Sequence, residues 1–218
     1  VLARSPVDLS MVTPIARLTT GFEVVVVPAS SPHKTLGDLL KAFRAEPGKV
    51  SWGGGSAGGT DHILVGLIAK AVGADTTKIN DVAFKGGGEA LTAIIGGHLT
   101  AGVSGLGEFA EQIKAGRLRA LAVSGPKAID GIASLKEQGV DVELGNWRGI
   151  FAAPGITPAQ RDALIVAVKS GTESPAWKDT LQKYGWDDAF LPGEDYRTFI
   201  EADVKRITAI IESLGLRR

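Results

Sequence analysis

The sequence of 218 residues lacks cysteine altogether and contains only three histidines. Without cysteine there can be no disulfide, thiolate zinc site, iron–sulfur cluster or cysteine nucleophile. The histidines, His33, His62 and His98, show none of the short spacings typical of a metal-binding pair. We therefore expect no metal site, no other cofactor and no thiol chemistry in this protein.

An excess of basic residues is also absent, because 24 lysines and arginines balance 24 aspartates and glutamates to a formal charge of +0. Proteins that bind nucleic acids or anionic membranes usually carry a basic surface, so we expect neither partner. No apolar run approaches the roughly 20 residues that a membrane-spanning helix needs. The chain is long enough to bury a core as one large domain or two small lobes.

Strand-like and helix-like segments alternate along the first two-thirds of the chain. Strands are expected at residues 22–28, 50–52, 81–84, 99–103 and 118–123, and a helix follows each of the first four. Thr35 and Asp38 form a capping-box pattern at the start of the first helix. This alternation predicts an α/β fold in which a mostly parallel sheet is flanked by helices.

The pattern changes after residue 145, where an extended apolar segment precedes a helix expected at residues 157–170. Thr157, Pro158 and Gln160 give that helix a strong N-terminal signal. A shorter helix, a strand and a long, one-sided apolar helix follow. We expect residues 22–145 to form one lobe, and residues 1–21 and 146–218 to belong to the other.

Glycine-rich junctions between strands and helices are the most informative motifs. Residues 53–59 and 85–88 each lead from a strand into a helix, where bare backbone N–H groups can hold an anion. The pattern is neither a Walker loop nor a dinucleotide fingerprint, and a turn without any ligand is the alternative. Ser104 ends a third strand, but no G-x-S-x-G motif supports a nucleophilic serine. No catalytic residue is expected.

Three segments, SWGGGSAGGTDHILVGLI, FKGGGEALTAIIGGHLTAG and IKAGRLRALAVSG, resemble the periplasmic solute-binding proteins of tripartite tricarboxylate transporters, the TctC or Bug family. The resemblance covers essentially the whole chain. It implies a type II periplasmic-binding-protein fold whose two lobes close around a small carboxylate. It also implies a periplasmic receptor that delivers its ligand to membrane permease subunits and performs no catalysis.

The resemblance assigns ligand contacts to the ends of three strands. They are Gly54, Gly55, Ser56, Gly58, Gly59, Thr60, His62, Lys85, Gly86, Gly87, Gly88 and Ser104. Gly54 and Gly55 stand where family members commonly have serines, and Ser104 stands where many have an aspartate. The absent aspartate removes a counter-charge for a ligand ammonium group, so plain carboxylic acids are expected as ligands rather than amino acids.

Family members also begin with a first-lobe strand and loop that have no counterpart in this sequence, which starts at Val1. Half of the carboxylate site is therefore expected outside the sequence, and the chain as given is expected to bind weakly and to self-associate through uncovered edges. The rival interpretation is the effector-sensing domain of a transcription regulator, which has the same general fold. A phosphate-handling enzyme ranks last, because the sequence offers no acidic metal cluster and no general base.

Overall fold

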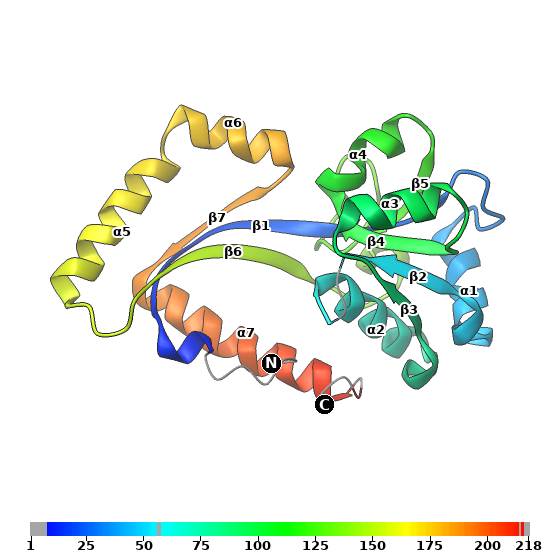
Figure 1. The fold of residues 1–218 in the computed structure, drawn as a ribbon, viewed down its shortest axis with the longest axis horizontal. Coiled ribbons are helices and arrows are strands. Elements are labelled where there is room, and N and C mark those ends of the chain that lie inside the picture. The colour runs from blue at the N-terminus through cyan, green and yellow to red at the C-terminus, as the bar shows by residue number, and fades with distance from the viewer. Residues whose placement is uncertain (1–7, 56–57, 214, 216–218) are drawn as a thin grey trace. The chain divides into compact units, whose positions relative to one another are not determined.

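The computed structural model describes residues 8–55, 58–213 and 215. The chain divides into two compact units: unit 1 is drawn from Val1–Gly21 and Asn146–Arg218, and unit 2 is Phe22–Gly145. The chain passes between the units twice, within β1 (Thr13–Pro28) and at the start of β6 (Gly145–Ala152). Figure 1 shows both passages as extended strands.

Unit 2 is built on a sheet with the strand order β3-β2-β4-β1-β5. Its remaining strands are β2 (Ser51–Gly54), β3 (Asn80–Ala83), β4 (Ala101–Gly105) and β5 (Leu118–Val123). β2 runs parallel to β3 and β4, whereas β1 runs antiparallel to β4 and β5. The predicted α/β class is confirmed, but the sheet is mixed at β1. β1 enters the sheet from unit 1 and runs against its neighbours, so its last residue, Pro28, pairs with Leu118, the first residue of β5.

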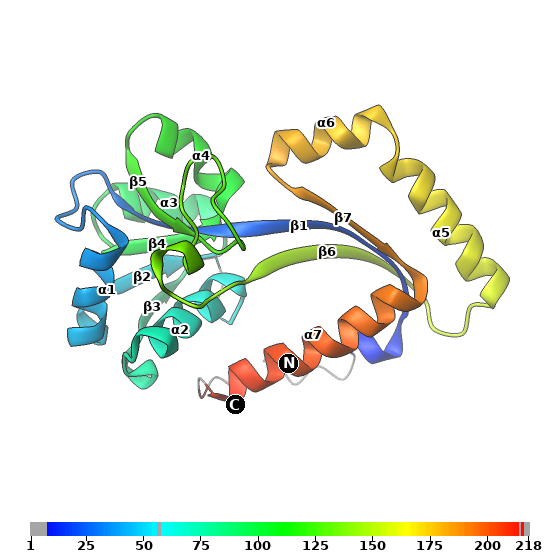
Figure 2. The ribbon, with the colours of Figure 1, turned by 180° about the vertical axis from the view of Figure 1, so that it is seen from behind.

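Helices cover both faces of this sheet. In the described part of unit 2 they are α1 (Leu36–Ala45), α2 (Thr60–Val72), α3 (Gly87–Ile95) and α4 (Leu106–Lys114). Short 3₁₀ helices lie at Pro47–Lys49 and Thr76–Lys78, before β2 and β3, and at Lys136–Gln138 after β5. The views in Figures 1 and 2 place α3 and α4 on one face and α1 and α2 on the other. This two-sided cover explains why the strands read as continuous apolar runs.

The valines of β1 form the centre of the unit 2 core. Val24 and Val26 pack against α3 and α4, where Ile94 is also fully buried. Val25 and Val27 are equally inaccessible to solvent, and the two-residue alternation of a strand directs them to the opposite face. One strand therefore supplies apolar contacts to both helical layers.

Unit 1 contains the first half of β1, to which β6 and β7 (Asp187–Pro192) pair. Its helices are α5 (Pro158–Thr172), α6 (Pro175–Tyr184) and α7 (Gly193–Ser213), and a 3₁₀ turn lies at Leu9–Met11. Tyr196 is fully buried, and its ring lies 5.8 Å from Trp147, 5.5 Å from Phe151 and 6.5 Å from Phe199. The indole of Trp147 also donates a hydrogen bond to Asp203. Trp147 is thus a packing residue of unit 1, as its apolar segment indicates.

The helix-start signals in the sequence are confirmed. In α1, Thr35 accepts from the backbone of Asp38 while the Asp38 carboxylate accepts from Thr35 N–H. In α5, Thr157 and Gln160 make the same reciprocal pair, and Pro158 occupies the first helical position. Each cap satisfies backbone donors that have no partner inside the helix.

Candidate functional site

Three strand-to-helix junctions in unit 2 meet at one edge of its sheet. β2, β3 and β4 share a direction, so the starts of α2, α3 and α4 follow their carboxyl ends. A Cβ placed on Gly55 would lie 3.5 Å from the Gly87 nitrogen, and a Cβ on Gly87 would lie 3.0 Å from the Ser104 hydroxyl. The structure therefore brings the predicted residues of all three junctions together.

The backbone donors of these junctions are partly occupied by the chain's own acceptors. Gly55 N–H donates to the Asp61 carboxylate. Gly58 N–H donates to His62 Nδ1 at 3.1 Å, and Lys85 N–H donates to the Glu89 carboxylate at 3.2 Å. The sequence predicts bare N–H groups at these positions, and for these three groups that expectation is wrong. Acidic side chains are favoured in the first turn of a helix, where they complement its dipole, and this explains the pairing with Asp61 and with Glu89.

His62 has two alternative partners at the same nitrogen. Its Nδ1 lies 3.1 Å from the Gly58 nitrogen and 3.4 Å from an oxygen of Asp81, the neighbouring carboxylate on β3. Nδ1 can accept from Gly58 only when it carries no proton, and it can donate to Asp81 only when it carries one. Gly58 has a φ of +73°, a conformation that favours glycine. His62 Nδ1 can therefore hydrogen-bond to only one of these two partners at a time.

Ser104 and Glu108 form the third element of the site. The Ser104 hydroxyl is buried and donates to Glu108 Oε2 at 2.7 Å, one helical turn further along the chain. A Cβ on Gly87 would overlap this carboxylate. Glycine at position 87 therefore leaves the space in which Glu108 rests against the start of α3.

Buried acids dominate the electrostatics of this edge. Burial raises the pKa of the Asp61 carboxyl, and the charge of Glu108 adds to this shift. The hydrogen bonds that Asp61 makes with Gly55 N–H and with the Glu23 side chain oppose it. Burial also raises the pKa of Asp81, and the adjacent His62 opposes that shift. Among the residues that the structure describes, no group of three or more acidic or histidine side chains is arranged to hold a metal ion.

The other predicted residues lie next to a buried acid, at helix starts or on the surface. A Cβ on Gly54 would lie 2.7 Å from the Asp61 Cβ, so glycine at position 54 makes room for that buried acid. Gly59 and Gly86 are the N-caps of α2 and α3, and Thr60 begins α2. The side chain of Lys85 and the backbone at Gly88 are exposed, and Ser56 lies outside the described residues.

Sequence reasoning missed four acidic residues at this edge: Asp61, Asp81, Glu108 and Glu23. Asp61 and Glu108 could have been found from the sequence, because each lies in the first turn of a helix that follows a glycine junction. An acid in that position is placed to contact the junction. Asp81 and Glu23 lie within strands and carry no local signal.

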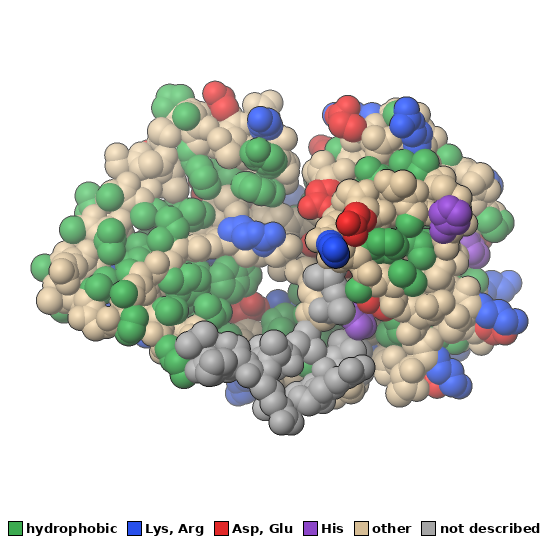
Figure 3. Space-filling view, viewed as in Figure 1, with side chains coloured by type: hydrophobic (Ala, Val, Ile, Leu, Met, Phe, Trp, Pro, Cys, Tyr) green, Lys and Arg blue, Asp and Glu red, His purple; other side chains and the backbone are tan. Residues whose placement is uncertain are grey.

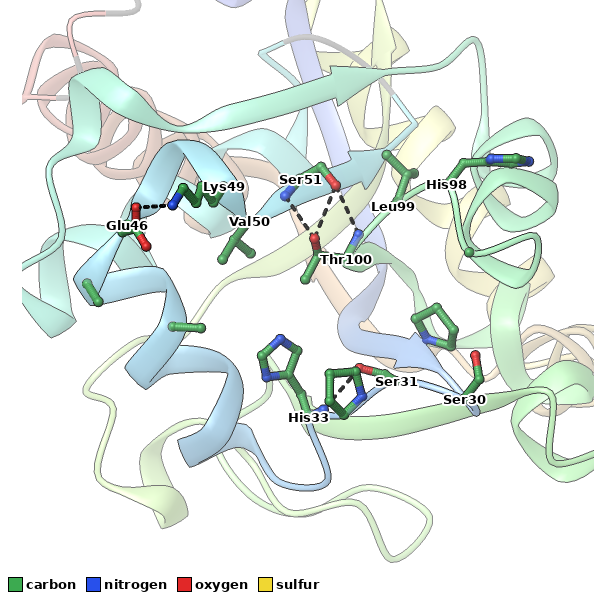
Figure 4. Close-up of a pocket in the computed structure, with 15 residues that line it drawn as sticks. Ser30, Ser31, His33, Glu46, Lys49, Val50, Ser51, His98, Leu99 and Thr100 are labelled. Atoms are coloured by element: carbon green, nitrogen blue, oxygen red, sulfur yellow. Dashed lines mark hydrogen bonds and ion pairs between the residues drawn. The ribbon is translucent and has the colours of Figure 1, made fainter.

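A separate cavity of about 600 Å³ lies at the other end of these strands. Figure 4 shows it bordered by the loop at Ser31 and His33, the end of α1, and the segments leading into β2 and β4. Ser51 and Thr100 hydrogen-bond to each other within it. None of the predicted site residues lines this cavity, so it is distinct from the glycine junctions.

Charged side chains are dispersed over the face of unit 2 that Figure 3 shows, with acidic and basic groups interspersed. This agrees with the formal charge of +0. Within the described residues, no helix combines the length and the apolar composition that crossing a membrane requires.

The comparison that decides the family is a match over nearly the whole chain. The model described as "Tripartite tricarboxylate transporter family receptor" matches residues 4–216. The chain belongs to this family. The resemblance seen in the glycine motifs is thereby confirmed, and receptors of the tripartite tricarboxylate transporter family are solute-binding proteins of the periplasm.

Curated relatives of the receptor family agree. A UPF0065 protein of Cupriavidus necator is 28% identical over 97% of this chain and 63% of its own length. The protein BugT of Bordetella pertussis is 24% identical over 84% of this chain and 56% of its own length. The chain spans 52% to 66% of the length of the curated relatives it matches.

Solved structures share the fold. A TctC solute-binding protein from Polaromonas has a TM-score of 0.77 at 25% identity, covering 96% of this chain and 72% of that one. An R. palustris protein determined with adipate has a TM-score of 0.85 at 22% identity, covering 97% and 72%. MatC from Rhodopseudomonas palustris, determined with bound malate, has a TM-score of 0.74 at 17% identity, covering 92% and 69%. The periplasmic-binding-protein fold is confirmed.

Proposed function

We propose that this protein is a periplasmic receptor that binds a small carboxylate and delivers it to the membrane permease of a tripartite tricarboxylate-type transporter. The observation that carries the proposal is the family match over residues 4–216. The convergence of three helix N-termini at one edge of unit 2 supports it, because helix N-termini favour anions. The related structures determined with adipate and with bound malate point to the same ligand class.

In this proposal the ligand contacts lie at the predicted junction residues, and the protein binds its ligand without chemical change. The first turns of α2, α3 and α4 are the anion-binding elements, because their glycine N-caps, Gly59, Gly86 and Gly105, make no side-chain hydrogen bond. The family match favours this receptor over the effector-sensing domain of a transcription regulator.

Thermal-shift screening of the full-length protein against carboxylic acids of three to six carbons tests the proposal. A ligand that binds only the folded state raises the melting temperature, by an amount that grows with its concentration. At least one carboxylate should do so and should be recovered unchanged. If no carboxylate raises the melting temperature while a neutral sugar or a nucleotide does, the proposed ligand class is wrong.

A matched pair of variants tests the location of the site. Gly58→Val places a branched side chain at a positive φ in the glycine junction, and Gly116→Val makes the same change at φ +68° beyond the end of α4, where no atom lies within 4 Å. Both variants suffer similar backbone strain. Only Gly58→Val should weaken carboxylate binding, by about tenfold or more, and equal affinities in the two variants would remove this loop from the site.

A further inference from the structure

The two partners of His62 Nδ1 require opposite proton states of that atom. Nδ1 lies 3.1 Å from the Gly58 nitrogen, whose N–H it can accept only through a lone pair. It also lies 3.4 Å from an oxygen of the Asp81 carboxylate, to which it can donate only through a proton. A proton on Nδ1 therefore moves the hydrogen bond from the junction before α2 to the neighbouring strand β3.

Burial gives each of these contacts weight. Only 16% of the His62 side chain and 10% of the Asp81 side chain are exposed. Hydrogen bonds and ion pairs in such a place are less screened by water than those on the surface. The three groups also come from separate positions in the fold, because Gly58 precedes α2, His62 lies in its first turn and Asp81 lies on β3.

Asp81 is the acceptor that a protonated His62 meets. Burial raises the pKa of the Asp81 carboxyl, the adjacent His62 opposes this shift, and the charge of Asp61 adds to it. The Asp61 carboxylate itself accepts from Gly55 N–H. An ionised Asp81 stabilises a proton on His62, because opposite charges at this distance attract each other.

The other charged groups around α2 act elsewhere. Glu23 and Glu108 influence the Asp61 carboxyl. α2 packs mainly against α1, β2, β4 and the 3₁₀ helix at Thr76–Lys78, and β2 and β4 carry no charged residue. Within the part of the chain that the structure describes, no charged side chain of α1 or of this 3₁₀ helix forms an ion pair with His62; these side chains are Asp38, Lys41, Arg44 and Lys78.

The direction of the pH effect follows from these contacts. Histidine is the side chain whose ordinary titration falls between about pH 5 and pH 8. Above this range the neutral ring, in the tautomer protonated at Nε2, accepts from Gly58 N–H. Below it both ring nitrogens carry protons, so Nδ1 can only donate and Asp81 is in place to accept. Gly58 N–H is then free for an anion at the start of α2, where the helix dipole favours negative charge.

We propose that His62 is a pH-dependent switch, in which protonation of the ring moves the Nδ1 hydrogen bond from Gly58 to Asp81 and frees the Gly58 N–H for the carboxylate ligand. Carboxylate affinity should then rise as pH falls through the range in which histidine titrates. The effect on binding rests on the proposed receptor function. The exchange of hydrogen bonds is a property of the ligand-free protein and can be measured without any ligand.

NMR of the ligand-free, full-length protein tests the exchange directly. The ring signals of His62 and the amide signal of Gly58 are recorded from about pH 5.5 to about pH 8. The Gly58 amide signal should follow the same titration curve as the His62 ring. Asp81→Asn removes the carboxylate that stabilises the protonated ring and should move both curves to lower pH. A Gly58 signal that stays constant while His62 titrates would overturn the inference.

Calorimetric titration with the carboxylate identified by thermal shift tests the effect on binding. The wild-type protein should bind about tenfold more tightly at the acid end of this range, because a hydrogen bond to a charged ligand becomes available. His62→Asn places an amide oxygen near the position of Nδ1 and cannot be protonated, so it should lose this pH dependence. His33→Asn and His98→Asn are the matched controls, because both residues line the separate cavity, and they should keep it. The titration of the ligand itself is common to all four proteins.

Failure of the switch and failure of the proposed function give different results. If carboxylate binds but His62→Asn keeps the wild-type pH dependence, His62 is not the switch, while the receptor function stands. If no carboxylate binds at any pH, the proposed function fails, and the NMR titration still decides whether the hydrogen bond moves. Circular dichroism establishes that each variant is folded.

Discussion

Replacing Gly87 with alanine should break the contact between α3 and Glu108. The new Cβ would overlap the Glu108 carboxylate and lie 3.0 Å from the Ser104 hydroxyl. Because Glu108 is exposed, its flexible end can swing into solvent, but the buried Ser104 then loses its acceptor. An unsatisfied buried polar group costs about 1–3 kcal/mol, and alanine in a helix regains about 0.5–1 kcal/mol relative to glycine.

Gly88→Ala is the matched control, because it is the next residue of α3 and a Cβ there meets no atom within 4 Å. Gly88→Ala should be stabilised only by the higher helix propensity of alanine. Gly87→Ala should therefore be less stable than Gly88→Ala by about 1–3 kcal/mol. Urea unfolding of both variants at one pH measures this difference. Equal stabilities would refute the placement of Glu108 against Gly87.

Two other changes test the buried acid and the unit 1 core. Burial raises the pKa of Asp61 above its ordinary 3.8, so the folded state retains a proton that the unfolded chain releases. The free energy of unfolding should therefore fall as pH rises from 3.8 to the raised pKa of Asp61. Asp61→Asn should reduce this fall in unfolding measured from pH 4 to 8, and an unchanged pH profile would contradict the prediction. Gly149→Ala would force a Cβ into the buried Tyr196 hydroxyl and should lower the stability by about 1–3 kcal/mol. In the control Gly171→Ala the new Cβ meets no atom within 4 Å, so no such loss is expected. Equal melting temperatures for the two variants in thermal unfolding would refute this packing.

The secondary structure could be predicted because its signals are local. The capping residues Thr35 and Thr157 act within one helical turn, and the valine run of β1 marks a strand covered on both faces. The direction of β1 relative to β4 and β5 could not be predicted in this way. It depends on where the strand enters the sheet, which is a property of residues far apart in the sequence.

The candidate site could be predicted only in part for the same reason. The glycines mark the three junctions, and the parallel strands bring those junctions to one edge. Asp61 and Glu108 look like ordinary first-turn acids in the sequence, because their contacts with Gly55 and Gly87 are made across a loop and across two helices. The hydrogen bond from Gly55 N–H to Asp61 and the contact of Glu108 with Gly87 are therefore visible only in three dimensions.

The central claim is tested most directly by comparing the binding of an acid with that of its uncharged ester. The acid that gives the largest thermal shift should be titrated calorimetrically into the full-length protein beside its methyl ester, which keeps the carbon skeleton and removes the charge. The acid should bind saturably at one site, and the ester should bind at least about tenfold more weakly, because a charge-assisted hydrogen bond is lost. Equal affinities for acid and ester would contradict the account of this protein as a carboxylate receptor.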